Sequence, residues 1–485
     1  MSHNDEKHQI GLITAISYTV GDIVGSGIFI SPTSILNHAG SVGLSLCLWA
    51  ICAGISTFGA LSYVELGTTI KKSGCDFAYL SYFGWRPIAS SFMWVSTCLS
   101  YPAVLAIQAV SFGEYVITGL DSWILLEDQW RFLAYRLVGF SMLWPLMFLN
   151  FFSLKKAVGY FQVVATAIKL IVAGIIIFTG FYYIIFKNST QNFHDSFHGS
   201  DWNAGGLVLG IYSGLFAYNG WDVLNFGAEE IENPRRTMPI AAISGICISA
   251  IVFILMNISY FSVLTVDDFK NSPAVAVTFA ERTLGNFHYA IPFLISILLI
   301  GSMNTTIFAS SRYMYAGAVE NVMPTPLKLI HNKTFSPRLA VFAEVLIAIS
   351  LSFIGNLDQI ISYMSFALWS QRTATQAGFI YYKLTGKLKN DEAFVVPAFV
   401  PIIFFMICIS LLVIPITQNY HVAIYGLSMT AGGAVIYVLF IFPDKLPKFL
   451  YFINDKIVKL AQLLFNTVVE QRVEVDSLSI SKIAL

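Results

Sequence analysis

A long apolar run near the N-terminus, residues 11–31, is interrupted by the sequence GDIVGSGIF, residues 21–29. Three glycines and an aspartate within this stretch break the pattern of a continuous apolar helix. Each glycine costs about 1 kcal/mol relative to alanine in a helix interior. The stretch therefore predicts a helix that is unwound near its middle, with backbone N–H and C=O groups left free.

The composition of the chain requires a bilayer around it. Of its 485 residues, 56% are hydrophobic and 12% are charged, whereas an ordinary soluble domain carries roughly twice that charge. Lysine plus arginine balance aspartate plus glutamate, so the basic excess of a nucleic-acid-binding protein is missing and we expect no nucleic acid partner. No metal-ligand spacing or nucleophile–base motif is present, so we expect no cofactor and no enzyme activity.

Apolar runs of about 20 residues predict membrane-spanning helices. The chain has twelve such runs, so we predict an all-α polytopic membrane protein. The runs are residues 11–31, 42–64, 87–118, 132–152, 159–186, 205–226, 238–263, 288–317, 339–355, 357–382, 395–417 and 421–443.

The basic residues of the loops predict the orientation, because cytosolic loops carry an excess of lysine and arginine. Even-numbered loops hold most of them, such as Lys71, Lys155 and Arg235, and the tail adds more. Odd-numbered loops hold few, with Lys187 and Lys270 among them. Both termini are therefore predicted to be cytosolic.

A second interruption, YSGLFAYNGWD at residues 212–222, lies in the sixth run. The two interruptions occupy matching positions if runs one to five and six to ten are inverted repeats. Paired interruptions of this kind predict a binding site near the membrane midplane. The resulting organisation is a cytosolic N-terminus, a first repeat, an extracellular loop, a second repeat, two further helices and a cytosolic tail, with bounds 1–10, 11–186, 187–204, 205–382, 383–443 and 444–485.

The freed backbone groups suit a zwitterion. A carboxylate can accept protons from the amides of Gly25, Ser26 and Gly27, helped by the positive end of the half-helix that follows. An ammonium group can donate to carbonyls near Ile23 and around Phe216 and Ala217. Val24 belongs to the same unwound segment. Close packing of helices at glycine is the alternative explanation.

Charged residues at membrane depth are usually functional. Asp22 can hold a substrate ammonium group, pair with Lys169 or carry a proton, and Asn219 with Asp222 can complete the polar pocket. Lys169 lies roughly ten residues into its run, or about 15 Å deep at the helical rise. Its ammonium group can replace a bound sodium ion and brace span one against span five, or it can simply face a wet cavity.

Several motifs resemble one family of membrane proteins. GSGIFISP at residues 25–32 resembles the span-one signature of the amino acid–polyamine–organocation superfamily. YVELGTTI at residues 63–70, and YSGLFAY with GW at residues 212–221, resemble the L-type amino acid transporters, the light chains of heteromeric transporters. The likeness extends to about residue 443.

The resemblance implies a twelve-span inverted-repeat (LeuT-like) fold and sodium-independent exchange of amino acids. It also implies that Phe216 is an aromatic gate and that Trp369 is a second gate residue. Lys169 matches a span-five lysine found where sodium-coupled relatives hold their ion. We expect neutral amino acids as substrates and the plasma membrane as the location.

The chain departs from the family in ways that bear on partners and substrates. The family usually carries a cysteine after span three that bonds a heavy chain, whereas residues 118–131 contain none, so no covalent heavy chain is expected. A partner bound without a disulfide remains an alternative. Asp22 and Asn219 stand where neutral and small residues are common, which keeps cationic substrates and proton coupling open.

Two peripheral motifs complete the predictions. Asn188-Ser189-Thr190 is an N-glycosylation acceptor in a predicted extracellular loop. The chain ends in Ile483-Ala484-Leu485, and the hydrophobic Ile483 and Leu485 suit strand addition in a PDZ groove. A receptor that binds amino acids without transporting them is the alternative function.

Overall fold

The computed structural model describes most of the chain between residues 11 and 469. The described residues are 11–70, 74–120, 126–152, 155–272, 274–332, 334, 336–353, 357–388, 392–418, 420–443 and 447–469. Ile483 and Leu485, the predicted PDZ ligand, lie outside them.

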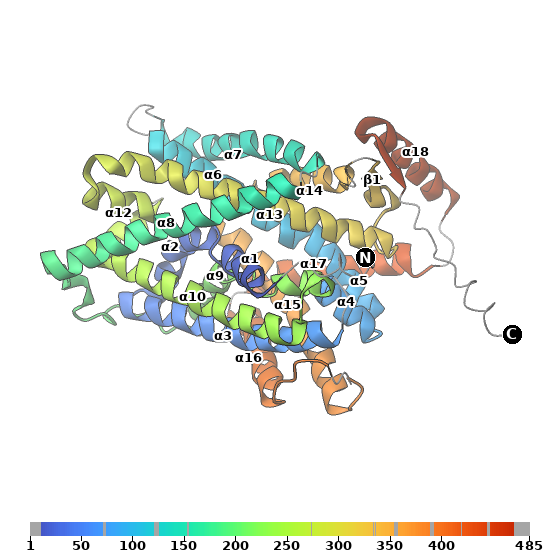
Figure 1. Cartoon of the computed structure of the whole chain (residues 1–485), viewed down its shortest axis with the longest axis horizontal. Helices are drawn as coiled ribbons and strands as arrows, with labels where there is room; N and C mark the ends of the chain where they lie inside the picture. The colour runs from blue at the N-terminus through green and yellow to red at the C-terminus, as the bar shows by residue number, and fades with distance from the viewer. Residues whose placement is uncertain are drawn as a thin grey trace.

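The described chain is a bundle of helices with one small sheet (Figure 1). Its α-helices are α1 Leu12–Ile23, α2 Gly27–Ala39, α3 Val42–Thr69, α4 Cys75–Tyr82, α5 Arg86–Val95, α6 Tyr101–Leu120, α7 Asp128–Phe151, α8 Lys155–Lys187, α9 Ala204–Ala217, α10 Pro234–Val263, α11 Val266–Asn271, α12 Val275–Thr283, α13 Ile291–Val319, α14 Arg338–Leu351, α15 Leu357–Leu384, α16 Phe399–Gln418, α17 Tyr420–Ile436 and α18 Lys448–Phe465. The strands are β1 Leu329–His331 and β2 Thr467–Val469.

Each of the twelve predicted apolar runs contains a helix in the structure. Within the described residues, eight helical spans are long and apolar enough to cross a membrane, and the bent pair α1–α2 makes a ninth. Helices α9 and α14 are shorter, with 14 residues each. Helix α15 has 28 residues and is long enough, but Arg372 and its serine, threonine and glutamine residues make it less apolar than these spans. The fold is therefore that of a polytopic helical membrane protein.

The first span is broken where the glycines stand. Helix α1 ends at Ile23, α2 begins at Gly27, and their axes differ by 44°. Helix α9 likewise ends at Ala217, and residues 218–222 form turns before a 3-10 segment, Val223–Glu230. Gly220 has φ +110° there, a conformation that favours glycine because it has no Cβ.

The two broken helices pack directly on each other. Ser34 of α2 and Ser213 of α9 share a hydrogen bond of 2.7 Å. A Cβ on Gly27 would lie 2.4 Å from the Cα atom of Ala217. This close approach brings the two unwound segments together in the middle of the bundle.

The loop elements gather at two opposite ends of the molecule. Helix α4, strand β1 and helix α18 lie toward one end of the long axis, and α12 lies toward the other (Figure 1). The first group belongs to loops predicted to be cytosolic and α12 to a loop predicted to be extracellular. The arrangement is the one that alternating spans produce.

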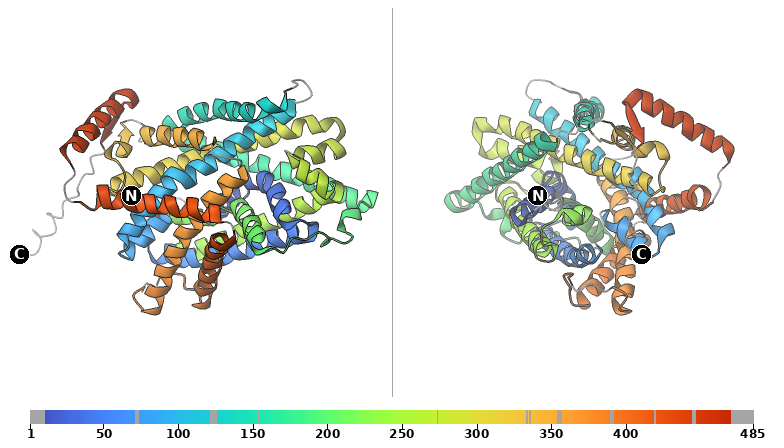
Figure 2. Two further views of the ribbon diagram at one scale, coloured as in Figure 1. Left: turned by 180° about the vertical axis from the view of Figure 1, so that it is seen from behind. Right: turned by 45° about the vertical axis from the view of Figure 1, so that its right-hand side comes forward.

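The start of the C-terminal tail is attached to the bundle. Strand β2 pairs antiparallel with β1, with Val468 opposite Ile330. Arg338 donates a hydrogen bond of 2.9 Å to the carbonyl of Phe465 at the end of α18. Seen from behind, α18 itself stands apart from the other helices (Figure 2).

Candidate substrate site

A cavity of ≈ 80 Å³ lies where the break between α1 and α2 meets the end of α9. Helices α6, α8 and α13 complete its wall. The lining residues are Gly21, Asp22, Ile23, Gly25, Ser26, Gly27, Val104, Gln108, Lys169, Phe216, Ala217, Asn219, Ser302, Thr305 and Thr306. Of the predicted substrate-binding residues, only Val24 is not among them.

The N-terminus of α2 offers the cavity its backbone amides. The first N–H groups of a helix have no acceptor within the helix, and they carry the positive end of its dipole. Ser26 and Gly27 stand at this end and line the cavity. Gly25 differs from the expectation, because its N–H donates to the carbonyl of Ile23 at 2.7 Å. The backbone amides that remain free to bind an anion are therefore those at the start of α2.

The end of α9 offers carbonyl groups. Helix α9 ends at Ala217, and Phe216, Ala217 and Asn219 line the cavity. The N–H of Asn219 donates to the Phe216 carbonyl at 3.2 Å. A carbonyl oxygen has two lone pairs, so it can still accept from an ammonium group in the cavity.

Lys169 joins α8 to the break in the first span. It is 2% exposed, and its Nζ donates to the carbonyl of Gly21 at 3.3 Å. This bond connects a fixed cation to one of the last backbone carbonyls of α1. The role of Lys169 as a replacement for sodium remains a prediction.

Asp22 lines the cavity and lies against the unwound part of the sixth span. Its carboxylate packs on Gly220, where a Cβ would meet Oδ2 at 2.5 Å. The structure therefore brings the first and second interruptions into contact through a carboxylate and a glycine.

The two predicted gate residues have different positions. Phe216 lines the cavity and packs against Ile360 and Met364. Trp369 is 1% exposed and does not line the cavity, and its ring lies 6.0 Å from that of Phe404. The gating role of Trp369 remains a prediction, and no contact with the cavity supports it.

One wall of the cavity consists of polar, uncharged side chains that sequence reasoning did not assign to the site. Thr306 of α13 donates to Gln108 of α6 at 3.0 Å, and Ser302 lies beside them with no partner for its hydroxyl among the described residues. The signal for them was weak, because single serine, threonine and glutamine residues are common in membrane helices.

Arg372 of α15 was also missed. Its side chain is 3% exposed and donates to Asp222 at 3.1 Å, and to Asn219 at 3.4 Å. The rule that drew attention to Lys169, a cation at membrane depth, would have identified it. Asp222 is thus buried against a cation, and it does not line the cavity.

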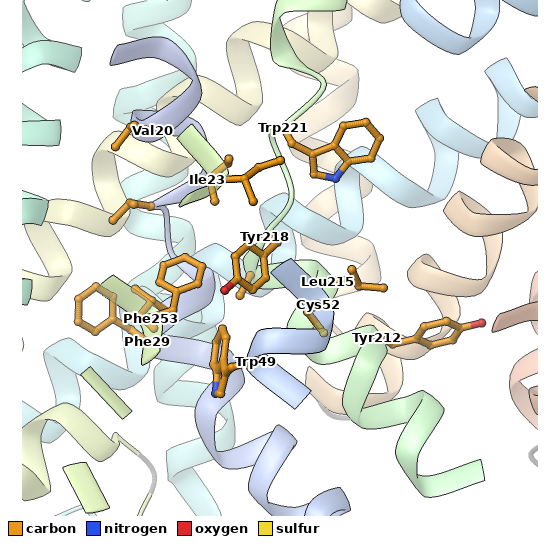
Figure 3. Packing of buried hydrophobic residues seen from close by; sticks show 14 of the residues in the cluster. Val20, Ile23, Phe29, Trp49, Cys52, Tyr212, Leu215, Tyr218, Trp221 and Phe253 are labelled. Atoms are coloured by element: carbon orange, nitrogen blue, oxygen red, sulfur yellow. The ribbon is translucent and has the colours of Figure 1, made fainter. Parts of the chain in front are cut away.

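An aromatic cluster supports the unwound segment on its other side (Figure 3). The rings of Trp49, Tyr218 and Phe253 contact one another at centroid distances between 5.0 and 6.1 Å. Aromatic contacts of this kind contribute about 0.5–1.5 kcal/mol beyond area burial. They hold Tyr218 fixed, one residue before the cavity-lining Asn219.

A polar cavity between two interrupted helices, inside an apolar helix bundle, defines a membrane transporter of the inverted-repeat kind. The model of the amino acid permease family matches residues 10–443, and the chain belongs to this family. This match confirms the family that the sequence motifs predicted.

Several relatives are similar over nearly their whole length. The amino acid transporter protein 6 of Caenorhabditis elegans is 43% identical over 97% of this chain and 91% of its own. The human cystine/glutamate transporter is 36% identical over 96% of this chain and 91% of its own. The mouse b(0,+)-type amino acid transporter 1 is 35% identical over 90% of this chain and 88% of its own. The relatives are amino acid transporters, and the chain is an integral membrane protein.

Asn188, the glycosylation candidate, is exposed directly after α8, with φ +50°. The following Ser189 donates to the carbonyl of Ser262 at the end of α10. The side chain of Asn188 is therefore free to be reached by an enzyme, and its modification stays a prediction.

Proposed function

We propose that this protein exchanges neutral amino acids across the plasma membrane without sodium. The observation that carries the proposal is the cavity itself, which combines the amide end of α2, the carbonyl end of α9 and the buried Lys169. These groups are complementary to the carboxylate and ammonium groups that every amino acid shares.

The charges of the cavity support a neutral substrate. Its lining contains one acidic side chain, Asp22, and one basic side chain, Lys169. The wall formed by Gln108, Ser302 and Thr306 is polar and uncharged. The charges of Asp22 and Lys169 sum to zero, so a substrate side chain with a net charge would add an uncompensated charge to the cavity, and burying it would be costly.

The proposed mechanism is alternating access around this fixed site. Residues 11–186 and 205–382 act as the two repeats, with residues 383–443 beside them, and both termini face the cytosol. The breaks at Val24 and Tyr218 are where each half can bend. Lys169 supplies the positive charge that a sodium ion provides in coupled transporters.

The partners proposed are amino acids and lipid, with a PDZ scaffold at Ile483 and Leu485. A covalent heavy chain is not proposed, because residues 118–131 contain no cysteine. The chain acts alone or with a subunit bound without a disulfide.

Uptake of labelled amino acids into cells that express the chain alone tests the proposal. The panel includes leucine, alanine, lysine and glutamate, measured with and without sodium and after preloading with unlabelled amino acids. Surface labelling measures delivery. Uptake of leucine or alanine that ignores sodium and rises with preloading supports exchange. Normal surface delivery without uptake contradicts an autonomous exchanger, and binding without flux would then support the receptor alternative.

A further inference from the structure

The buried pair Asp222–Arg372 lies directly behind the cavity wall. Asp222 follows α9 in the unwound segment, and Arg372 comes from the middle of α15. Their side chains are 10% and 3% exposed, and their charged atoms are 3.1 Å apart. Arg372 also contacts Asn219, which lines the cavity. Only one residue therefore separates the arginine from the substrate.

The guanidinium group of Arg372 is held in place by two tryptophans. It lies 4.4 Å from the ring centroid of Trp221 and 5.0 Å from that of Trp369. Desolvated cation–π contacts contribute about 2 kcal/mol. The cation can therefore not turn away to water, and its charge acts on the site at all times.

The carboxylates on either side of Gly220 show why that charge matters. Asp22 packs on Gly220 from the first span, and Asp222 follows it by two residues. Without Arg372, Asp222 would be an unpaired carboxylate directly behind a cavity whose lining holds one carboxylate, Asp22, and one cation, Lys169. With Arg372, the charges of Asp22, Asp222, Lys169 and Arg372 sum to zero. The next buried carboxylate, Asp76, accepts hydrogen bonds from Tyr63 and Thr375 and does not line the cavity.

We infer that Arg372 determines the charge selectivity of the site: by neutralising Asp222 it restricts the cavity to zwitterionic amino acids and excludes cationic ones. Removing Arg372 leaves a buried carboxylate that a substrate cation can compensate, since a buried charge needs a partner. Removing Asp222 leaves a buried cation, which disfavours cationic and favours anionic substrates. The inference rests on the proposed function, because it specifies which amino acids the site admits.

The test compares R372Q, D222N and the double variant D222N/R372Q. The readouts are uptake of labelled leucine, lysine and glutamate, and the lysine concentration that halves leucine uptake. In R372Q, lysine competition should strengthen by about tenfold or more, the order expected for one charge acting over several ångströms at an effective dielectric of about 20. In D222N, lysine should compete less strongly with leucine uptake and glutamate more strongly. In the double variant, competition by both should return to the wild-type value.

The matched control is K383Q. Lys383 is also in α15 and forms a buried ion pair, with Glu65, but neither residue lines the cavity. K383Q should therefore leave the ratio of lysine to leucine unchanged. Surface labelling corrects every uptake value for the amount of protein at the cell surface. If R372Q does not reach the surface, the competition values of D222N and the double variant test the inference.

Unchanged lysine competition in both R372Q and D222N would overturn the inference, as would an equal change in K383Q. Failure of R372Q to transport leucine without recovery in the double variant would also overturn it. If the wild type shows no flux, thermal stabilisation of the purified chain by leucine and lysine gives the same comparison. The experiment therefore distinguishes a failure of the charge-selectivity inference from a failure of the proposed transport function.

Discussion

Gly27 shows how one missing Cβ atom shapes the site. Helix α2 crosses α9 so closely that a Cβ on Gly27 would lie 2.4 Å from the Cα atom and 3.0 Å from the Cβ atom of Ala217. These are a backbone atom and a short side chain, which cannot swing aside as the end of a long side chain would. The cavity wall depends on this contact, because Gly27 and Ala217 both line it.

We expect G27A to destabilise the protein by about 1–3 kcal/mol, the usual cost of overpacking, and to abolish uptake of the substrate. The melting temperature in detergent and uptake corrected for surface delivery measure the two effects. The control is G54A, because a Cβ on Gly54 meets no atom within 4 Å. Similar behaviour of the two variants would contradict the packing argument.

Lys169 is the second residue whose substitution has a defined outcome. K169M keeps an unbranched side chain one atom shorter than lysine, and it removes the charge and the hydrogen bond to Gly21. A hydrogen bond from a charged donor contributes about 1.5–3 kcal/mol, so uptake should fall by about tenfold or more. K169R keeps the charge and should retain part of the activity. Transport by K169M at the wild-type rate would exclude a bracing role for the ammonium group.

At the scale of elements, α11 and α12 form a small unit held by polar contacts. Thr265 caps α11 in a capping box with Asp268, and Arg282 of α12 donates two hydrogen bonds to the Asp268 carboxylate. Arg282, with Thr265, holds the pKa of the Asp268 carboxyl well below its usual range. The pair is partly exposed, so its contribution to stability is small.

The sign of the pH dependence follows from that lowered pKa. The ionised carboxylate stabilises the unit at every pH above the unfolded value of about 3.9, and the stabilisation is lost as pH falls further toward the folded pKa. Hydrogen exchange in α11 and α12, corrected for intrinsic rates, should show constant protection between about pH 5 and 8 and a decline below about pH 4. D268N should lower protection at neutral pH and remove the decline, and an unaltered decline in D268N would assign it to another group.

At the scale of the whole molecule, the alternation of loops between two ends sets the topology. Helix α4, β1 and α18 lie toward one end of the bundle and α12 toward the other (Figure 1). The loops and the tail that contain the first group carry an excess of lysine and arginine, which predicts that this end faces the cytosol.

Glycosylation tests this orientation directly. N188Q should lack a glycan and therefore run faster on a gel than the wild type. Treating the wild type with a glycosidase should give the same mobility as N188Q. N332Q is the matched control, because Asn332-Lys333-Thr334 has the same pattern in a loop predicted to be cytosolic. A glycan on Asn332, or equal mobility of N188Q and untreated wild type, would argue against the proposed orientation.

The sequence by itself determined the helices, the two breaks and most of the backbone part of the site. Apolar runs must form helices in lipid, because no water satisfies the backbone there. Glycine-rich stretches interrupt them because glycine has a low helix propensity. Both are local properties of the chain. Hence the interruptions at residues 21–29 and 212–222 identified the cavity, including Asp22 and Phe216, and the charge at membrane depth identified Lys169.

Only the tertiary structure decided which side chains from distant helices complete the site. Gln108 and Thr306 meet across 198 positions of sequence, and Arg372 reaches Asp222 across 150. Val24 and Trp369 are excluded from the lining for the same reason, although both stand on the expected segments. Side-chain direction depends on how helices rotate and pack against each other, and packing is a property of pairs of helices that no single segment of sequence contains.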